Sequence, residues 1–241
     1  MSGERKLANI DRDDPAPFRH WRWWLLPSFA MFLVLIASLV IYPFVDTRPG
    51  LRPIAHLVDI AAVLLVVRLV RSVYTLVSSG WVIAIPNVIF QLWFLLAPSP
   101  SIEVAMLSAQ MLFHGWAIIA LLSYVLADSV VTRDELFALA ALYVLLAFFW
   151  ASGYGLVVHF DPAALAVGAT NNPSGQTSFA DLVYFSMTTM TSTGYGEITP
   201  VAPLARAMAM VQQLTGVLFV AMLISRLATL NRRHGSLDSP D

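Results

Sequence analysis

The sequence predicts an all-α membrane protein with six transmembrane helices and one shorter helix that enters and leaves the membrane on the same side. Two properties of the 241-residue chain lead to this class. Hydrophobic residues make up 58% of the chain and charged residues only 12%, which is more apolar surface than a soluble fold can bury. The chain also contains six apolar runs, each long enough to cross a hydrocarbon core of roughly 30 Å.

The six apolar runs are separated by short breaks that are rich in turn-forming residues. The breaks cover residues 46–50, 78–80, 98–101 and 128–135. About 22 mostly polar residues precede the first run, so we expect a retained helix there rather than a signal peptide. The runs are Trp24–Phe44, Ile54–Ser78, Trp81–Ala97, Val104–Leu126, Leu136–Val158 and Leu204–Leu227.

Basic residues at the two ends of the chain predict its orientation in the membrane. Lys and Arg concentrate on the cytoplasmic side of membrane proteins, so both termini are expected to be cytoplasmic, which agrees with an even number of spans. We therefore expect a multi-pass protein of the plasma membrane. The basic residues are Arg5, Lys6, Arg12, Arg19 and Arg22 before the first run, and Arg226, Arg232 and Arg233 near the end.

The longest break, residues 159–200, is expected to be extracellular. It contains three acidic residues, Asp161, Asp181 and Glu197, and no Lys or Arg. The basic-residue rule is not obeyed everywhere, because Arg48, Arg52 and Arg206 fall on the same outer side.

A half-length helix is predicted inside this long break, over residues 178–190. Ser178 can cap its N-terminus, and Asp181 three residues later completes a short form of the capping box. About 12 helical residues extend only ~18 Å, so this helix cannot span the membrane. Non-helical backbone at membrane depth is tolerated only inside protein or beside a water-filled cavity. The segment that follows this helix therefore predicts a pore.

Residues 184–200 resemble the pore sequence of potassium channels, most closely the prokaryotic two-helix pore module. The common core of that family reads Thr-Val-Gly-Tyr-Gly-Asp, and here Ser192, Thr193 and Glu197 replace its threonine, valine and aspartate. The resemblance covers roughly Leu136–Leu230. It implies a selectivity filter formed by Thr191, Ser192, Thr193, Gly194, Tyr195 and Gly196.

The resemblance implies that K⁺ binds to backbone carbonyls of residues 192–195. Ser192, Thr193, Gly194 and Tyr195 would supply the carbonyl rings, and the Ser192 hydroxyl would add an innermost oxygen. Gly194 and Gly196 are expected to adopt positive φ, which glycine does without steric cost. A ring of four carbonyls needs four chains, so a homotetramer in a lipid bilayer is expected. No cofactor other than permeant K⁺, no nucleic acid partner and no enzymatic activity are expected.

The same resemblance implies that residues next to the filter hold it in position. Tyr195 is expected to pack behind the filter against Tyr184 and Phe185, positions that the family often fills with tryptophan. Thr188 stands where some members carry a buried glutamate, so no carboxylate contact behind the filter is expected from it. Glu197 occupies the position of the aspartate that follows the filter.

Two glycine motifs outside the filter need separate interpretation. Gly153-Tyr154-Gly155 repeats the filter tripeptide within the fifth run but has no threonine run before it, which favours close helix packing. Gly216 lies in the last run, where the family often has a gating hinge. Close helix packing explains Gly216 equally well, and both interpretations stay open.

The chain is expected to divide into two membrane domains with short cytoplasmic ends. Residues 24–131 form a four-helix domain that resembles a voltage sensor without gating arginines, because 104–127 contains no Lys or Arg. Residues 132–230 form the pore domain, while 1–23 and 231–241 are cytoplasmic. Arg68 and Arg71 have suitable spacing but lie on the second run, where they can reach the membrane surface.

Three ionisable residues lie in or near the four-helix domain. Asp59 is expected to pair with an arginine of the second or a neighbouring run, because an unpaired charge in a membrane is costly. His114 is expected to be a neutral interior histidine, with a pH sensor as the alternative. Glu103 is the third ionisable residue of this group.

Three further functions compete with that of a potassium channel. A weakly selective or non-selective cation channel is the main alternative, because the filter departs from the commonest sequence. An enzyme is disfavoured, since His114 and His159 have no evident partners. A secondary transporter would show interrupted helices in both halves of the chain, and only one interruption is present. The gating stimulus is not evident from the sequence.

Overall fold

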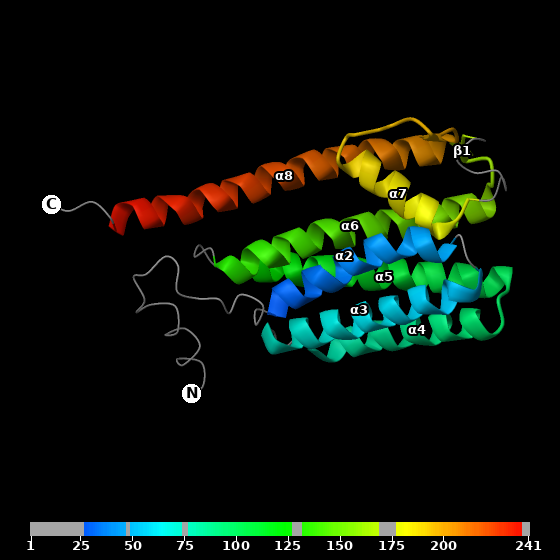
Figure 1. The fold of residues 1–241 in the computed structure, drawn as a ribbon, viewed down its shortest axis with the longest axis horizontal. Coiled ribbons are helices and arrows are strands. Elements are labelled where there is room, and N and C mark those ends of the chain that lie inside the picture. Colours follow the sequence, from blue (N-terminus) through cyan, green and yellow to red (C-terminus); the bar gives the residue numbers. More distant parts are fainter. Residues whose placement is uncertain (1–26, 47–48, 74–76, 127–131, 169–176, 238–241) are drawn as a thin grey trace.

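The computed structural model describes residues 27–46, 49–73, 77–126, 132–168 and 177–237. Within these ranges the long helices run in alternating directions, so that α2 begins and α8 ends at the same end of the bundle (Figure 1). The helices are α2 (Pro27–Asp46), the 3₁₀ turn η2 (Pro49–Leu51), α3 (Arg52–Val73), α4 (Val77–Leu96), α5 (Pro100–Val125), α6 (Arg133–Phe160), α7 (Phe179–Met190) and α8 (Pro203–Leu237).

Four described helices are long and apolar enough to cross a membrane. Helix α4 contributes a shorter apolar stretch, Gly80–Leu96. Helix α3 is more polar, because it contains Asp59, Arg68 and Arg71. Membrane crossing by α3 and α4 therefore stays a prediction. The four apolar segments are Ser28–Val45, Pro100–Val125, Asp134–Phe160 and Pro203–Arg226.

The predicted helix boundaries are correct to within a few residues at most breaks, with two exceptions. The turn predicted at 78–80 is wrong, because α4 already begins at Val77 and includes these residues. Gly80 has a packing role instead: a Cβ there would lie 2.6 Å from a ring carbon of Trp116 on α5. The second exception is the end of the last apolar run, predicted at Leu227, since α8 continues to Leu237; the cytoplasmic position of 231–241 stays a prediction.

Helix α6 forms the centre of the molecule. It packs against α2 and α5 of the four-helix domain on one side, and against α7 and α8 on the other. Within its apolar span 61% of the residues are buried, compared with 22% in α8. Ala138, Ala141 and Ala147 of α6 are fully buried. Their small side chains allow the neighbouring helices to approach α6 closely. Helix α6 therefore lies between the helices that precede it, α2 and α5, and the helices that follow it, α7 and α8.

A small antiparallel sheet joins the two ends of the segment between α6 and α8. Strand β1 (Leu165–Val167) pairs with β2 (Ile198–Pro200), in a register that places Leu165 opposite Pro200. This pair was not predicted, because three residues are too few to show a strand pattern. It brings the end of α6 beside the start of α8 (Figure 1).

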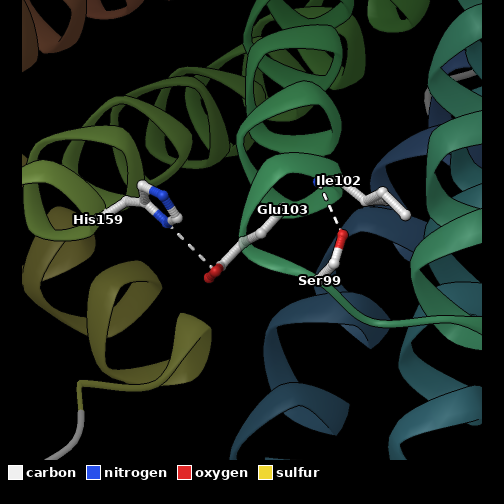
Figure 2. A network of polar contacts seen from close by, with 4 residues as sticks. All are labelled: Ser99, Ile102, Glu103 and His159. Atoms are coloured by element: carbon white, nitrogen blue, oxygen red, sulfur yellow. Dashed lines mark hydrogen bonds and ion pairs between the residues drawn. The ribbon is translucent and has the colours of Figure 1, made fainter.

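One side-chain contact links α5 to α6 at this same end of the bundle. Figure 2 shows His159, in the last turn of α6, facing Glu103 in the first turn of α5, with Nδ1 and Oε2 separated by 3.2 Å. The expectation that His159 lacks a partner is therefore wrong. The Glu103 side chain is 44% exposed, so solvent screening limits the energy of this pair.

Candidate functional site

Helix α7 has the half-length and the capping predicted from the sequence. The Ser178 hydroxyl accepts from the backbone N–H of Asp181 at 3.2 Å, and the Asp181 carboxylate accepts from the Ser178 N–H at 3.0 Å. This is a complete capping box, so that prediction is confirmed. Helix α7 begins near the end of α6 and stops part-way along the bundle, and the chain then returns to its starting end (Figure 1).

The segment after α7 is held to the last turn of that helix by backbone hydrogen bonds. The N–H of Ser192 donates to the Thr189 carbonyl at 3.0 Å. The N–H groups of Thr193 and Gly194 both donate to the Thr188 carbonyl, at 2.9 and 3.2 Å. In addition, the Thr191 hydroxyl donates to the Met187 carbonyl at 2.8 Å. The beginning of the segment is therefore fixed relative to α7, while its side chains are exposed.

Positive φ recurs at every second residue of this segment. Gly194 has φ 52° and Gly196 has φ 91°, as expected from the sequence. Ser192 also has positive φ, 56°, which was not expected because side chains disfavour this region. Such backbone strain in a residue other than glycine is concentrated at functional sites in proteins.

Tyr184 contacts both Tyr195 and Glu197. The ring of Tyr195 stacks on that of Tyr184 at a centroid distance of 6.4 Å and an interplanar angle of 7°. The Tyr184 hydroxyl donates in turn to the Glu197 carboxylate. The expected contact between Tyr195 and Phe185 is wrong: Phe185 points into the core, where its ring lies 4.9 Å from that of Tyr154.

A buried hydrogen-bond network behind α7 was not predicted from the sequence. The Tyr154 hydroxyl donates to Oε1 of Gln212 at 2.8 Å, and Nε2 of Gln212 donates to the Ser186 carbonyl at 2.9 Å. The Ser186 hydroxyl donates to the Ala147 carbonyl on α6 at 2.7 Å. The network thus connects α6, α7 and α8. A glutamine in an apolar span is the sequence signal that could have indicated it.

Replacement of Gln212 by leucine is expected to destabilise the protein. Tyr154, Ser186 and Gln212 have no measurable solvent exposure, so their remaining polar groups would lose a partner without gaining water. A buried unsatisfied group costs about 1–3 kcal/mol. The melting temperature in detergent should therefore fall. Gln213→Leu is the matched control, because Gln213 is exposed; equal melting temperatures for both variants would contradict this role of the network.

The glycines outside the filter segment lie at close helix contacts. A Cβ on Gly153 would lie 3.0 Å from Met208, and one on Gly155 would lie 3.1 Å from Leu107, so the packing interpretation of this tripeptide is confirmed. A Cβ on Gly216 would lie only 2.1 Å from the Met190 carbonyl oxygen. Helix α8 is continuous through Gly216. Packing is thus an observed role of Gly216, and hinge bending stays a prediction.

The Thr188 side chain bonds within its own helix, where its hydroxyl donates to the Phe185 carbonyl at 3.1 Å. In the part of the chain that the structure describes, no group of three or more His, Cys, Asp or Glu side chains is arranged to hold a metal ion.

Comparison with known families identifies the region that contains this site. Residues 121–233 match a family model described as "Ion channel". The match begins near the end of α5 and includes α6, the capped helix α7, residues 191–196 and most of α8. A search of curated proteins finds no match to the chain.

Proposed function

We propose that this chain, whose residues 121–233 form an ion channel domain, is one subunit of a potassium-selective channel. Ion channel families are not enzyme families, and four of the described helices are long and apolar enough to cross a membrane, which supports the proposal. In our proposal the chain conducts K⁺ passively across the plasma membrane, and its filter is the segment 191–196. The termini are cytoplasmic and the filter faces the outside.

One observation carries this proposal: a capped half-helix is followed by a segment with positive φ at Ser192, Gly194 and Gly196. Alternation of left- and right-handed backbone turns successive carbonyls toward one side of the chain, whereas in an extended strand they alternate between sides. Carbonyls on one side can replace the hydration shell of K⁺. The ions would bind at carbonyls of residues 192–195.

The exposure of the filter segment supports assembly into a homotetramer. Residues 191–196 are all exposed in the single chain, although exposed irregular backbone is not tolerated in lipid. Four chains around one axis would cover these residues and complete the carbonyl rings. An exposed apolar surface on α8 supports the same assembly: Met210, Val211, Leu214, Val217, Leu218 and Ile224 are each more than half exposed.

Helix α7 would contribute to ion binding through its dipole. Its C-terminus, at Met190, carries roughly half a negative charge from the aligned peptide dipoles of the helix. Four such ends would converge below the filter and stabilise a cation there. The Tyr184 contacts with Tyr195 and Glu197 would hold the outer part of the filter in position.

A weakly selective or non-selective cation channel is the second candidate. Two departures from the family's filter sequence favour it: Thr193 replaces valine by a polar side chain, and Ser192 lacks the methyl group of threonine. The Thr193 hydroxyl lies 2.8 Å from that of Thr191, so it takes part in a polar contact that valine could not make.

Ion flux from liposomes that contain the purified protein tests the proposal. Rapid K⁺ efflux with little Na⁺ efflux, and block by Ba²⁺, is the expected result. Comparable efflux of both ions would favour the second candidate. Saturable uptake coupled to a second solute would instead contradict a channel altogether.

A further inference from the structure

The first helices of the chain, together with α6, surround a small cavity that is partly lined by polar side chains. It has a volume of about 20 Å³ and lies between α2, α3, α4, α5 and α6. That volume is enough for about one water molecule. Its polar lining comes from four helices, with Ser38, Asp59, Asn87, Gln91, Gln110 and His114.

Several buried polar atoms of this cavity lack a protein partner. Among the described residues, Nδ2 of Asn87, Oε1 of Gln91, Oε1 of Gln110 and Nδ1 of His114 make no hydrogen bond. The three amide side chains are at most 3% exposed. Buried polar groups are almost always hydrogen-bonded, and a mixture of donors and acceptors around a small cavity is suited to water. The cavity therefore has the size and the polar groups to hold a water molecule.

Asp59 is the acidic group of this cavity. Its described partner is the Tyr42 hydroxyl, which donates to Oδ2. The expected arginine partner is not found among the described side chains: Arg68 is exposed, and the side chain of Arg71 lies outside the described part of the chain. An ionised carboxylate in a membrane is costly without a counter-charge, whereas a protonated carboxyl is not.

We propose that Asp59 reversibly binds a proton in this cavity, and that its protonation regulates ion flow. The regulatory part rests on the proposed channel function. Besides Asp59 on α3, the ionisable group that lines the cavity is His114 on α5, and Tyr42 on α2 contacts Asp59 directly. The lining residues of α4 and α6 are neutral: Asn87 and Gln91, and Leu145 and Phe148, respectively.

Tyr42 provides a physical connection between Asp59 and the filter-bearing domain. Its ring lies 5.3 Å from that of Phe179, the first residue of α7, and 6.0 Å from that of Phe148 on α6. His114 stacks on the same Phe148 ring at 5.9 Å. A change in the hydrogen bond between Asp59 and Tyr42 would therefore alter the packing at the start of the half-helix.

Asp59→Asn tests the proposal, because asparagine is uncharged at every pH and resembles a protonated carboxyl. Currents of the wild type and the variant are recorded in bilayers from about pH 5 to about pH 9. The wild-type open probability should vary with pH, and the variant should lose this variation and stay at the wild-type acidic level. Variation that persists in Asp59→Asn, or that disappears only in His114→Gln, would overturn the proposal, as would a pH-independent wild type.

Tyr42→Phe is a second test of the proposal, and Glu103→Gln is its control. Tyr42→Phe keeps the ring contacts but removes the hydroxyl, so it should weaken the pH response although Asp59 still binds its proton. Glu103→Gln removes a carboxylate that contacts His159 and does not line the cavity, so it should leave the response unchanged.

Infrared difference spectra detect the protonation of Asp59 directly and do not depend on a measurement of ion current. The wild type should show a pH-dependent carboxylic C=O band that is absent in Asp59→Asn, and identical spectra would overturn the proposal. A wild type that conducts no ion would overturn the proposed channel function, and the infrared band then tests proton binding separately.

Discussion

Replacement of Gly216 by alanine is expected to abolish ion flux and to lower the melting temperature. The added Cβ would lie 2.1 Å from the Met190 carbonyl oxygen and 2.9 Å from its carbonyl carbon. Both atoms are backbone, so neither can move away by a change of rotamer. Overpacking typically costs about 1–3 kcal/mol, and more where backbone must shift. Met190 is the last residue of α7, directly before the filter segment, so the shift would displace the filter.

Flux assays and thermal melts of Gly216→Ala distinguish the two interpretations of this glycine. A variant that assembles normally, with unchanged stability and an altered open probability, would favour a hinge over packing. Gly115→Ala on α5 is the matched control, because its Cβ would meet Phe149 at an ordinary 3.5 Å. A Gly216→Ala protein with wild-type stability and flux would contradict both interpretations.

Replacement of Gly194 by alanine is expected to abolish selective conduction. Gly194 has φ 52°, and an L-residue in this left-handed region loses about 1–2 kcal/mol per position. In a ring of four chains the cost would be roughly 4–8 kcal/mol, enough to displace the carbonyls from a common axis. A Cβ there meets no atom within 4 Å in the single chain, so the expected effect comes from backbone conformation and not from a clash within the chain.

Flux of K⁺ and Na⁺ through Gly194→Ala liposomes measures this effect. The control is Gly168→Ala, close to the same end of the molecule, where φ is not positive and the nearest atom to a Cβ is 3.5 Å away. Selective K⁺ flux in Gly194→Ala would show that positive φ at this residue is not required for conduction.

Features that depend on neighbouring residues in the chain were predicted from the sequence. The capping box requires only Ser178 and Asp181 three positions apart, and the two glycines of the filter segment adopt positive φ because they lack a Cβ. The resemblance to ion channels likewise came from a local pattern, and residues 121–233 match an ion channel family model. The roles of the individual filter residues stay predictions, since they depend on ions and on other subunits.

Features that depend on distant residues were not predicted. Tyr154 and Gln212 are 58 positions apart, and only the packing of α6 beside α8 brings them together. The contact of Asp59 with Tyr42 likewise depends on how α2 packs against α3. Ser192 was missed for a different reason: its positive φ follows from the bonds of its neighbours to the last turn of α7, not from its own preference.

The reversal potential of the wild-type protein under bi-ionic conditions tests the central claim most directly. With K⁺ on one side of a planar bilayer and Na⁺ on the other, each tenfold preference for K⁺ shifts the reversal potential by about 59 mV. A carbonyl-lined filter over residues 191–196 predicts that the reversal potential shifts by more than about 59 mV toward the equilibrium potential of K⁺. A reversal potential near zero would contradict it.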